Sequence, residues 1–382
     1  MDLGFTPEEH AFAAEARAWL SEHLGEVPQF ADLDQEVEWG RRWQARMAEG
    51  RWVGIYWPAA YGGRGASPVQ VALFNMEYAR AGAPQPVNRV GLNLAGPTLL
   101  AHGTEDQKQR WLPSILDASE IWCQLFSEPD AGSDLASLRT RAEPATDDRG
   151  RPGWRLTGQK VWTSYAAHAR WGICLARTDP EAGKHRGISY LVVDMSDPGV
   201  EVRPLRQITG EVEFNEVFLD DVWVPADHLV GGLHQGWTVA NTTLAHERGT
   251  NFPFKEQVVH EVFLQRLVEL ADAEGALDDP EVADALVDAA VRLSVLRLHN
   301  WRTLTALSAG QEPGAESSWI KLAWTDMTQS LSSAALDVLG DDAPLWGPWQ
   351  RQWLWSRAAP IAGGTSEIQR TIIGERLLGL PR

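Results

Sequence analysis

The segment that decides the fold reads Phe126-Ser-Glu-Pro-Asp-Ala-Gly-Ser-Asp134. It stands where a sequence with helical periodicity gives way to one typical of strands. Its small and turn-forming residues let main-chain N–H groups approach a ligand closely, and Ser127 and Ser133 add hydroxyl groups. On its own the segment is better explained as an ordinary turn rich in Asp and Gly, so its meaning depends on the sequence around it.

The residues before this segment are predicted to form a mostly helical domain over 1–120. Thr6 and Glu9 make a capping box around Pro7, which suits the first turn of a helix. Further helices are expected at 38–49, 67–81 and 92–102, separated by Gly and Pro.

The residues after it are predicted to form a β domain over 121–230. Residues 155–162 indicate two short strands about a Thr157-Gly158 turn. Residues 187–195 are rich in Ile, Leu, Val and Tyr, and residues 211–215 alternate with the period of a half-buried strand.

The helical period returns at Gly236 and continues over a third domain, 231–382. Long helices are expected at 252–273, 280–310 and 315–339, and a last helix at 366–378. Their lengths suit a helical bundle. Helices, then strands, then helices predict segregated layers, so the expected fold class is α+β, mainly α.

Composition restricts the class of protein. The 382 residues are 44% hydrophobic and 23% charged, which is typical of a globular chain. The 52 acidic residues outnumber the 34 basic ones, and a net charge of −18 disfavours nucleic acid and anionic membranes as partners. Two cysteines, Cys123 and Cys174, form no disulfide framework, and no Cys/His cluster has the spacing of a zinc site, so no metal site is predicted.

The first residues, MDLGFTPEEH, lack the basic and apolar regions of a signal peptide. No stretch approaches the roughly 18 apolar residues of a membrane helix. We therefore expect a soluble cytoplasmic protein. The 19 tryptophans are mostly expected in the core, although tryptophan also lines wide pockets.

Two more segments carry possible chemistry. In Lys160-Val-Trp-Thr-Ser164, a strand tryptophan beside two hydroxyl residues can stack on a flat ring, although a core tryptophan is the commoner explanation. In Ile361-Ala-Gly-Gly-Thr-Ser-Glu-Ile-Gln-Arg370, two glycines precede a Thr/Ser helix start, which is a natural anion or cofactor contact. An ordinary capped helix explains this segment equally well.

Together these segments resemble the acyl-CoA dehydrogenase family, and the resemblance covers nearly the whole chain. Other motifs follow in the family's order: Trp57-Pro-Ala-Ala-Tyr-Gly-Gly-Arg-Gly65, Gly103-Thr-Glu-Asp-Gln-Lys-Gln-Arg-Trp-Leu-Pro113, Val222-Trp-Val-Pro225 and Gly236-Trp237. The resemblance implies an N-terminal helical domain, a middle β domain and a C-terminal four-helix bundle. It also implies FAD between the β domain and the bundle, with part of the site supplied by a neighbouring subunit.

The resemblance assigns site residues by position. The residues expected to line the flavin ring are Leu125, Ser127, Trp162 and Ser164. Ser133 matches a contact to the CoA arm, and Thr365 and Glu367 match cofactor contacts in the last motif.

The implied reaction removes two hydrogens from a CoA thioester: a carboxylate takes the α proton and the β hydrogen passes as hydride to flavin N5. Many members carry the base just before the last motif, where this chain has Gly363. The base then matches Glu247, which shares a helix face with Trp237 and Leu244. Burial and the helix end would both raise its pKa. A solvated Glu or a salt-bridge partner is the plain alternative.

The resemblance also implies a role for the region around Gly363, where many members carry the base. Arg248 matches an arginine near the acyl-CoA, and main-chain N–H groups at Gly363 and Gly364 can reach the thioester oxygen. A missing side chain at Gly363 resembles members that accept bulky or branched acyl groups, including steroid side chains. Fatty acid or steroid degradation is the expected setting, and electron-transfer flavoprotein the expected acceptor.

Two departures concern the cofactor. The usual Arg-x-x-Phe-Gly is missing between Gly249 and Val291, and Leu339-Gly340-Asp341-Asp342 replaces a glycine-rich segment that receives the adenosine half. Two carboxylates repel a diphosphate. Because both losses fall on the part of the site given across the subunit interface, we expect a second dehydrogenase-like chain in an α2β2 hetero-oligomer, with a homotetramer as the alternative.

Two other functions remain open at this point. The chain could be a non-catalytic partner subunit that completes another chain's site. It could also use the same fold as a flavin oxidase or monooxygenase, since fold does not determine function.

Overall fold

The computed structural model describes residues 4–247, 251–311 and 314–381. Within these ranges the chain forms two compact units. The sheet unit comprises Glu26–Gly65 and Pro84–Glu247, and the bundle unit comprises Met1–Gly25, Ala66–Ala83 and Arg248–Arg382. Each unit has its own hydrophobic core.

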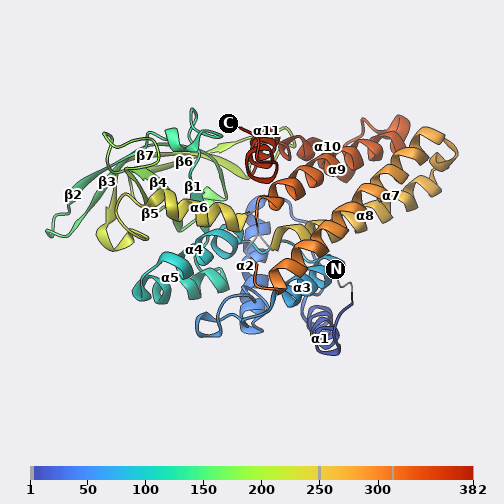
Figure 1. The fold of residues 1–382 in the computed structure, drawn as a ribbon, viewed down its shortest axis with the longest axis horizontal. Helices are drawn as coiled ribbons and strands as arrows, with labels where there is room; N and C mark the ends of the chain where they lie inside the picture. The colour runs from blue at the N-terminus through green and yellow to red at the C-terminus, as the bar shows by residue number, and fades with distance from the viewer. Residues whose placement is uncertain (1–3, 248–250, 312–313, 382) are drawn as a thin grey trace. The chain divides into compact units, whose positions relative to one another are not determined.

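The sheet unit is built on one mixed seven-stranded sheet (Figure 1). Its strand order is β1-β4-β2-β3-β7-β6, and β5 pairs with β4. The pairs of β1 and β2 with β4 are parallel, and all other pairs are antiparallel. The strands are β1 (Trp122–Leu125), β2 (Arg141–Thr146), β3 (Pro152–Ser164), β4 (Trp171–Arg177), β5 (Ile188–Asp194), β6 (Val200–Leu205) and β7 (Phe214–Pro225).

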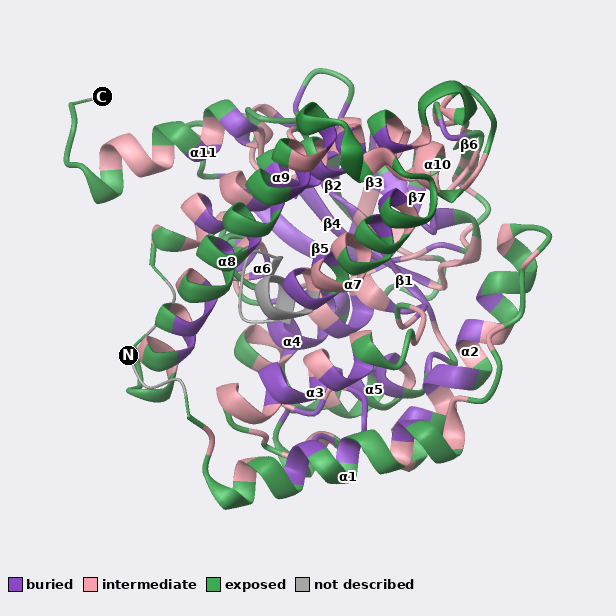
Figure 2. Ribbon diagram, turned by 90° about the vertical axis from the view of Figure 1, so that its right-hand side faces the viewer, coloured by how far each residue is buried: buried purple, intermediate pink, exposed green. Residues whose placement is uncertain are grey.

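The core of the sheet unit lies along β4 and β5, which are buried over almost their whole length (Figure 2). Strands that are buried on both faces have continuous apolar sequences, as these two do. Strand β7 instead alternates buried and half-exposed residues along its first half. The cysteines Cys123 and Cys174 are free and buried in this core.

The predicted turn at Thr157-Gly158 is wrong, because β3 continues through both residues as one strand. Its register against β7 shifts between Leu156 and Gly158. A Cβ atom on Gly158 would lie 2.4 Å from the Thr140 hydroxyl oxygen and 2.8 Å from the Thr140 Cα. Glycine is therefore needed here for the close approach of β2, and no turn is involved.

The predicted strand at 211–215 is correct only at its end, since β7 begins at Phe214. The residues before it form a turn in which the Gln207 N–H donates to the Glu211 carbonyl at 2.9 Å. The hydrogen bond that a strand would need at Glu211 is thus used locally.

Four α-helices belong to the sheet unit: α2 (Leu33–Glu49), α4 (Gly96–His102), α5 (Glu105–Asp117) and α6 (Gly236–Glu247). A π-helical turn, Gly91–Ala95, leads into α4, so the predicted helix at 92–102 is confirmed but irregular at its start. Thr104 and Gln107 form a capping box that starts α5, a helix the sequence analysis did not predict.

The bundle unit contains the remaining helices: α1 (Pro7–His23), α3 (Pro68–Arg80), α7 (Asn251–Ala273), α8 (Pro280–Ser308), α9 (Glu316–Leu339), α10 (Pro348–Trp355) and α11 (Ser366–Ile372). Helices α7, α8 and α9 pack against one another, and α10 packs on α9 (Figure 1). A π-helical turn, Ile373–Leu377, follows α11.

Local start signals explain where these helices begin. The predicted capping box of Thr6 and Glu9 is present at α1, and Asp279 caps α8 ahead of Pro280. The long helices predicted at 252–273, 280–310 and 315–339 are confirmed within one or two residues. The predicted stop at Gly249 lies outside the described residues.

Helix α3 packs on α7 and α8, and α1 packs on α3, so both helices belong to the bundle unit although they lie in the first 120 residues. The boundaries at residues 120 and 230 stay a prediction about sequence domains. In the described part of the chain, no helix is long and apolar enough to cross a membrane. No group of three or more His, Cys, Asp or Glu among the described residues is placed to hold a metal ion.

Candidate functional site

Two segments predicted to face a flavin ring lie side by side in the sheet unit. The Val161 N–H donates a hydrogen bond of 2.9 Å to the Ser127 carbonyl. This contact joins the turn that follows β1 to the last part of β3, which carries Trp162 and Ser164. The fold therefore brings together residues separated by more than thirty positions, as the family resemblance implies.

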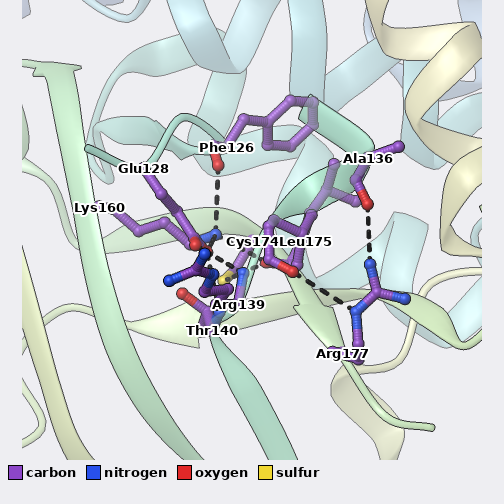
Figure 3. A network of polar contacts seen from close by, with 10 residues as sticks. Phe126, Glu128, Ala136, Arg139, Thr140, Lys160, Cys174, Leu175 and Arg177 are labelled. Carbon is purple, nitrogen blue, oxygen red and sulfur yellow. Dashed lines mark hydrogen bonds and ion pairs between the residues drawn. The ribbon is translucent and has the colours of Figure 1, made fainter. Parts of the chain in front are cut away.

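A buried ammonium group holds these two segments together (Figure 3). The Lys160 side chain is completely buried, and its Nζ donates to Glu128 Oε1 at 2.9 Å. The same Nζ donates to the carbonyl oxygens of Phe126 at 3.2 Å and Leu175 at 2.8 Å. All three ammonium protons thus have an acceptor, which is the condition for burying a charge.

The Glu128 carboxylate is also well satisfied. It accepts hydrogen bonds from the N–H groups of Arg139 at 2.6 Å and Thr140 at 2.9 Å, besides the bond from Lys160. Burial alone would raise the pKa of Glu128, but the Lys160 charge and these donors outweigh it and hold the pKa below its ordinary value. Glu128 therefore stays ionised and is engaged as an anchor within the protein.

Trp162 presents a flat apolar surface beside these anchored segments. Its backbone is in the left-handed region, with φ +60°, where β3 slips in register between Lys160 and Thr163. The side chain is 63% exposed although Val161 and Thr163 on either side are buried. The Phe214 ring meets it edge-on, with centroids 6.1 Å apart, and fixes its orientation.

Trp162 is predicted to face the isoalloxazine ring of FAD, and an exposed flat ring is compatible with that prediction. A large exposed aromatic ring on a strained, well-anchored strand is unusual without a ligand. Ser127 and Ser164 are half-exposed next to it and carry hydroxyl groups for the ring's edge. Leu125 differs, because its side chain is fully buried in the sheet core, so any contact to the ring is left to its main chain.

The backbone after Ser164 is held from a third direction. The Tyr165 N–H donates to the Glu213 carbonyl at 3.1 Å, and the Glu213 carboxylate pairs with Arg89 at 2.9 Å. Burial raises the pKa of Tyr165 to about 12, so its phenol is neutral. The whole segment from Lys160 to Tyr165 is therefore fixed at both ends.

Ser133 lies on an exposed loop that follows the anchored turn. The next residue, Asp134, pairs with Lys184 at 2.6 Å and accepts a hydrogen bond from Ser137. An exposed hydroxyl on a tethered loop is compatible with contact to the CoA arm, which stays a prediction.

The last motif forms a loop in the bundle unit. Gly363 and Gly364 both have positive φ, and the Thr365 hydroxyl caps α11 by accepting from the Ile368 N–H at 3.3 Å. Glu367 is exposed in the first turn of α11, where hydrogen bonds from its own N–H and from the Thr365 hydroxyl lower its pKa. Its carboxylate is exposed and lies 3.6 Å from Arg370 Nη1, and its contact with the cofactor stays a prediction.

Glu247 is the last residue of α6, and Arg248 lies outside the described residues. The start of α6 packs directly on β5, since a Cβ atom on Gly236 would lie 2.4 Å from the Ser189 carbonyl carbon. One turn before Glu247, the buried Thr243 hydroxyl lies 2.8 Å from the Thr98 hydroxyl and 3.2 Å from that of Tyr190. The helix that carries the predicted base is thus held at its start and again one turn before its end.

The sequence analysis missed the pair of Lys160 and Glu128. A signal was present, since Lys160 and Glu128 carry opposite charges in two segments that the family resemblance brings to one site. Opposite charges in two segments predicted to meet are a reason to expect a pair. The hydrogen bond between the hydroxyls of Thr98 and Thr243 could not be expected in this way, because neither side chain is charged.

Comparison with known proteins places the chain in a family. Residues 6–119, 123–222 and 234–378 match the acyl-CoA dehydrogenase N-terminal, middle and C-terminal domains. The order of helical, β and helical domains expected from the sequence is confirmed.

Named relatives agree. The acyl-CoA dehydrogenase IpdE1 of Mycobacterium tuberculosis (strain ATCC 25618 / H37Rv) is 43% identical over 383 residues, which cover 97% of each chain. The acyl-CoA dehydrogenase FadE34 of the same strain is 42% identical over 97% of this chain and 50% of its own length.

Among solved structures, one described as "Tcur3481-Tcur3483 steroid ACAD" superposes with a TM-score of 0.88 at 30% identity, over 100% of both chains. The ChsE4-ChsE5 complex from Mycobacterium tuberculosis gives a TM-score of 0.84 at 31% identity, again over 100% of both chains. These matches and the domain matches confirm the resemblance drawn from the motifs. The chain belongs to the acyl-CoA dehydrogenase family of FAD-dependent flavoenzymes.

Proposed function

We propose that the chain catalyses α,β-dehydrogenation of an acyl-CoA thioester, with Glu247 as the base. The observation that carries the proposal is the joining of the two ring-facing segments through Val161 and Ser127 beside the exposed Trp162. This arrangement serves a flavin ring, and the redox chemistry then follows from the family.

The reaction needs one base and one electron acceptor. The carboxylate of Glu247 takes the α proton, and the electrons of that C–H bond form the new Cα=Cβ double bond. The β hydrogen leaves with its bonding electrons, which FAD accepts when it is bound. The proton that Glu247 receives is later released to solvent, so atoms and electrons balance.

The position of α6 supports Glu247 as the base. Gly236, Thr98 and Thr243 fix this helix within the sheet unit. A base at the C-terminal end of a helix gains a raised pKa from the helix dipole, which suits proton abstraction near neutral pH. At the alternative position, Gly363 offers no side chain. From the family motif alone, we propose that Arg248 contacts the acyl-CoA substrate.

We infer a bulky or branched acyl group, including steroid side chains, as the substrate class. The missing side chain at Gly363 leaves space where many members carry their base. The structural neighbour described as a steroid ACAD supports this class. The assigned contacts are Ser133 to the CoA arm, Gly363 and Gly364 to the thioester, and Leu125, Ser127, Trp162, Ser164, Thr365 and Glu367 to FAD.

We also propose an α2β2 assembly with a second dehydrogenase-like chain, and electron-transfer flavoprotein as the acceptor in the cytoplasm. Asp341 and Asp342 are exposed where a diphosphate would be received, and they repel it. The neighbours described as Tcur3481-Tcur3483 and as the ChsE4-ChsE5 complex each contain two chains by name, which supports a partner chain here.

The first experiment follows the visible flavin band anaerobically while acyl-CoA thioesters are added. The chain is purified alone and together with the product of an adjacent dehydrogenase-like gene. Bleaching only in the two-chain sample, with half an FAD per chain, supports the assembly. One FAD per chain in a stable homotetramer that bleaches alone contradicts the assembly and leaves the reaction intact.

The second experiment tests the base. Glu247→Gln is expected to lower turnover about 10²–10⁴-fold, the usual contribution of general base catalysis. Glu269→Gln is the matched control, because Glu269 is an exposed residue of α7 whose carboxylate accepts a hydrogen bond of 3.0 Å from Gln265. Unchanged turnover in Glu247→Gln favours the non-catalytic subunit, and rapid reoxidation of the reduced flavin by oxygen favours an oxidase or monooxygenase.

A further inference from the structure

The proposed base is at the end of a helix that two other elements hold. Helix α6 packs on α4 and on β5 within the sheet unit (Figure 1). Thr243 is the last residue of α6 that the structure describes as buried, and Ala245 and His246 after it are exposed. Glu247 follows Thr243 by four positions, so the contacts of Thr243 lie about one helical turn from the base.

The Thr243 hydroxyl is shared among three elements. Its Oγ1 lies 2.8 Å from Thr98 Oγ1 on α4 and 3.2 Å from the Tyr190 hydroxyl oxygen on β5. The Val239 carbonyl of its own helix is further away, at 3.3 Å. A threonine inside a helix commonly bonds the carbonyl four residues before it. Here the shortest contact is to another helix, so this hydroxyl joins α6 to its neighbours.

The three hydroxyl-bearing side chains are closed off from solvent. Thr98 and Thr243 are 0% exposed, and Tyr190 is 1% exposed. Burial raises the pKa of Tyr190, so its phenol is neutral and can donate a hydrogen bond. Because these groups are buried, they act through the elements that they join and not by contact with a ligand.

A second contact joins the same two helices. His102 Nε2 on α4 lies 2.8 Å from the Thr242 hydroxyl oxygen on α6. Thr98 and His102 are four positions apart and share one face of α4. Thr242 and Thr243 are neighbours, so their side chains leave α6 about 100° apart. Two bonds in different directions from one face of α4 fix the rotation of α6 about its own axis, which a single bond would allow.

The two bonds differ in how well they resist water. His102 and Thr242 are both half-exposed, so water can replace the bond between them. The bond between Thr98 and Thr243 is buried, and water cannot take the place of either hydroxyl. The buried bond therefore carries most of the constraint on the rotation of α6.

A small rotation of α6 would displace the base by a distance that matters. The ends of side chains lie about 5–6 Å from a helix axis, so a rotation of about 10° moves them by about 1 Å. A misplacement of about 1 Å can lower the rate of an enzyme about 10²-fold. Glu247 is the last residue of α6, so its position follows the rotation of the helix directly.

We propose that Thr243 is a positioning residue that fixes the rotation of α6 and thereby the direction of the Glu247 carboxylate. The inference rests on the proposed function, because it needs Glu247 to be the base. Thr243 acts through the helix and has no chemical step of its own. Its loss should therefore slow removal of the α proton and change substrate binding and FAD content little.

The test compares Thr243→Val with Thr328→Val in the holoenzyme, including the partner chain if one is required. Thr328 is the matched control, because it is a buried threonine of the bundle unit whose hydroxyl also joins two helices, 2.9 Å from His260 Nε2. Thr243→Val is expected to lower kcat about 10–10²-fold, with KM changed less than about threefold. Thr328→Val should keep the wild-type kcat, and so should Thr243→Ser, which retains the hydroxyl.

Two further readouts separate positioning from a general loss of structure. In a Glu247→Gln background no base remains to be misplaced, so Thr243→Val should change the residual rate less than about threefold. With a substrate that carries deuterium at its α carbon, the isotope effect on kcat should rise in Thr243→Val and not in Thr328→Val, because removal of the α proton then limits turnover. A general loss of structure would lower the residual rate in the Glu247→Gln background as well.

A wild-type kcat in Thr243→Val overturns the inference, and so does an equal loss of rate in the Glu247→Gln background. If Thr243→Val yields no folded protein, Thr98→Val replaces it, because Thr98 is the partner in the buried bond. A lower kcat at the wild-type Tm then supports the inference, and a wild-type kcat overturns it.

Failure of the proposed function has a different signature. Full turnover in Glu247→Gln alone contradicts the assignment of the base, and the inference about Thr243 falls with it. A wild type that no acyl-CoA bleaches contradicts the proposed reaction as a whole. A low rate in Glu247→Gln together with a wild-type rate in Thr243→Val contradicts the positioning role alone.

Discussion

The chain holds its two ligand-facing segments in opposite ways. The strand segment from Lys160 to Ser164 is anchored by a buried ion pair in which every Lys160 proton has an acceptor. The loop at Gly363 and Gly364 is held by the neutral side chain of Gln369. Its Nε2 donates to both glycine carbonyls, and its buried Oε1 has no donor among the described residues. A buried charge pair holds its segment rigidly, but removing one partner lowers the stability of the fold strongly. The two hydrogen bonds from a neutral amide contribute less stability, and their loss affects only the loop that they hold.

The largest expected effect comes from breaking the ion pair on one side. Lys160→Met leaves the Glu128 carboxylate buried without its cation, and we expect the free energy of unfolding in urea to fall by about 3–5 kcal/mol. Gln369→Leu should lower it by only about 1 kcal/mol. Similar losses in the two variants would remove the difference between the segments.

The matched control is Arg17→Met. Arg17 also pairs with a buried carboxylate, Glu77, but its own side chain is mostly exposed and Glu77 keeps Arg80 at 2.8 Å. An exposed partner is replaced by water, so a loss of about 0–1 kcal/mol is expected.

Acid should separate the two segments next. The pKa of Glu128 is lowered in the folded state, so the pair adds stability above the ordinary value of 4.5, and this stability is lost as the pH falls through the lower folded pKa. The double variant Lys160→Met/Glu128→Leu removes both charges. Its difference from the wild type in free energy of unfolding should shrink below pH 4.5. The neutral side chain of Gln369 gives stability that does not depend on pH. If the difference in free energy of unfolding between the wild type and the double variant stays constant into the acid range, the ion pair does not stabilise the strand segment as we expect.

A smaller effect is expected on cofactor affinity. Trp162→Asn removes the exposed ring, and asparagine tolerates the positive φ of this position. We expect the Kd for FAD to rise about tenfold, the energy of one aromatic stack, and the Tm to stay near the wild-type value. Trp346, an exposed tryptophan of the bundle unit, gives the control variant Trp346→Asn. Equal FAD affinity in the two variants would argue against a ring at Trp162.

The smallest effect concerns the cap behind the loop at Gly363 and Gly364. Thr365→Ala removes the acceptor for the Ile368 N–H and should cost about 1 kcal/mol, whereas Thr365→Ser should cost little. Amide exchange in α11 measures the difference. Thr371→Ala, further along the same helix, should leave that exchange unchanged, and equal effects at both positions would count against a specific cap.

Local signals explain why much of the fold could be predicted. Thr6 with Glu9, and Asp279 before Pro280, start helices through bonds to residues at most three positions away. The prediction failed at Gly158, where the reason for glycine is the close approach of Thr140, the residue before β2. A reason that lies elsewhere in the chain cannot be found from the residues around it.

The same division applies to the candidate site. The motifs around Ser127, Trp162 and Thr365 could be recognised because short sequences carry them. The contacts of Lys160 and of Gln369 depend on which main-chain carbonyls the fold brings within hydrogen-bond distance. The sequence does not show which carbonyls these are. Glu247 is between these cases, since its helix is predicted from the sequence and its role as base stays a proposal.

Four glutamine side chains each donate hydrogen bonds to two main-chain carbonyls, and this affects how the protein responds to ionic strength. A chain with a net charge of −18 carries strong self-repulsion that changes with ionic strength. Gln44 joins α2 to α5, and Gln107, Gln350 and Gln369 join helices to neighbouring turns and loops. These side chains carry no charge, so dissolved ions do not screen their contacts. A change in ionic strength should therefore alter the chain's encounters with charged partners while these contacts keep their shape.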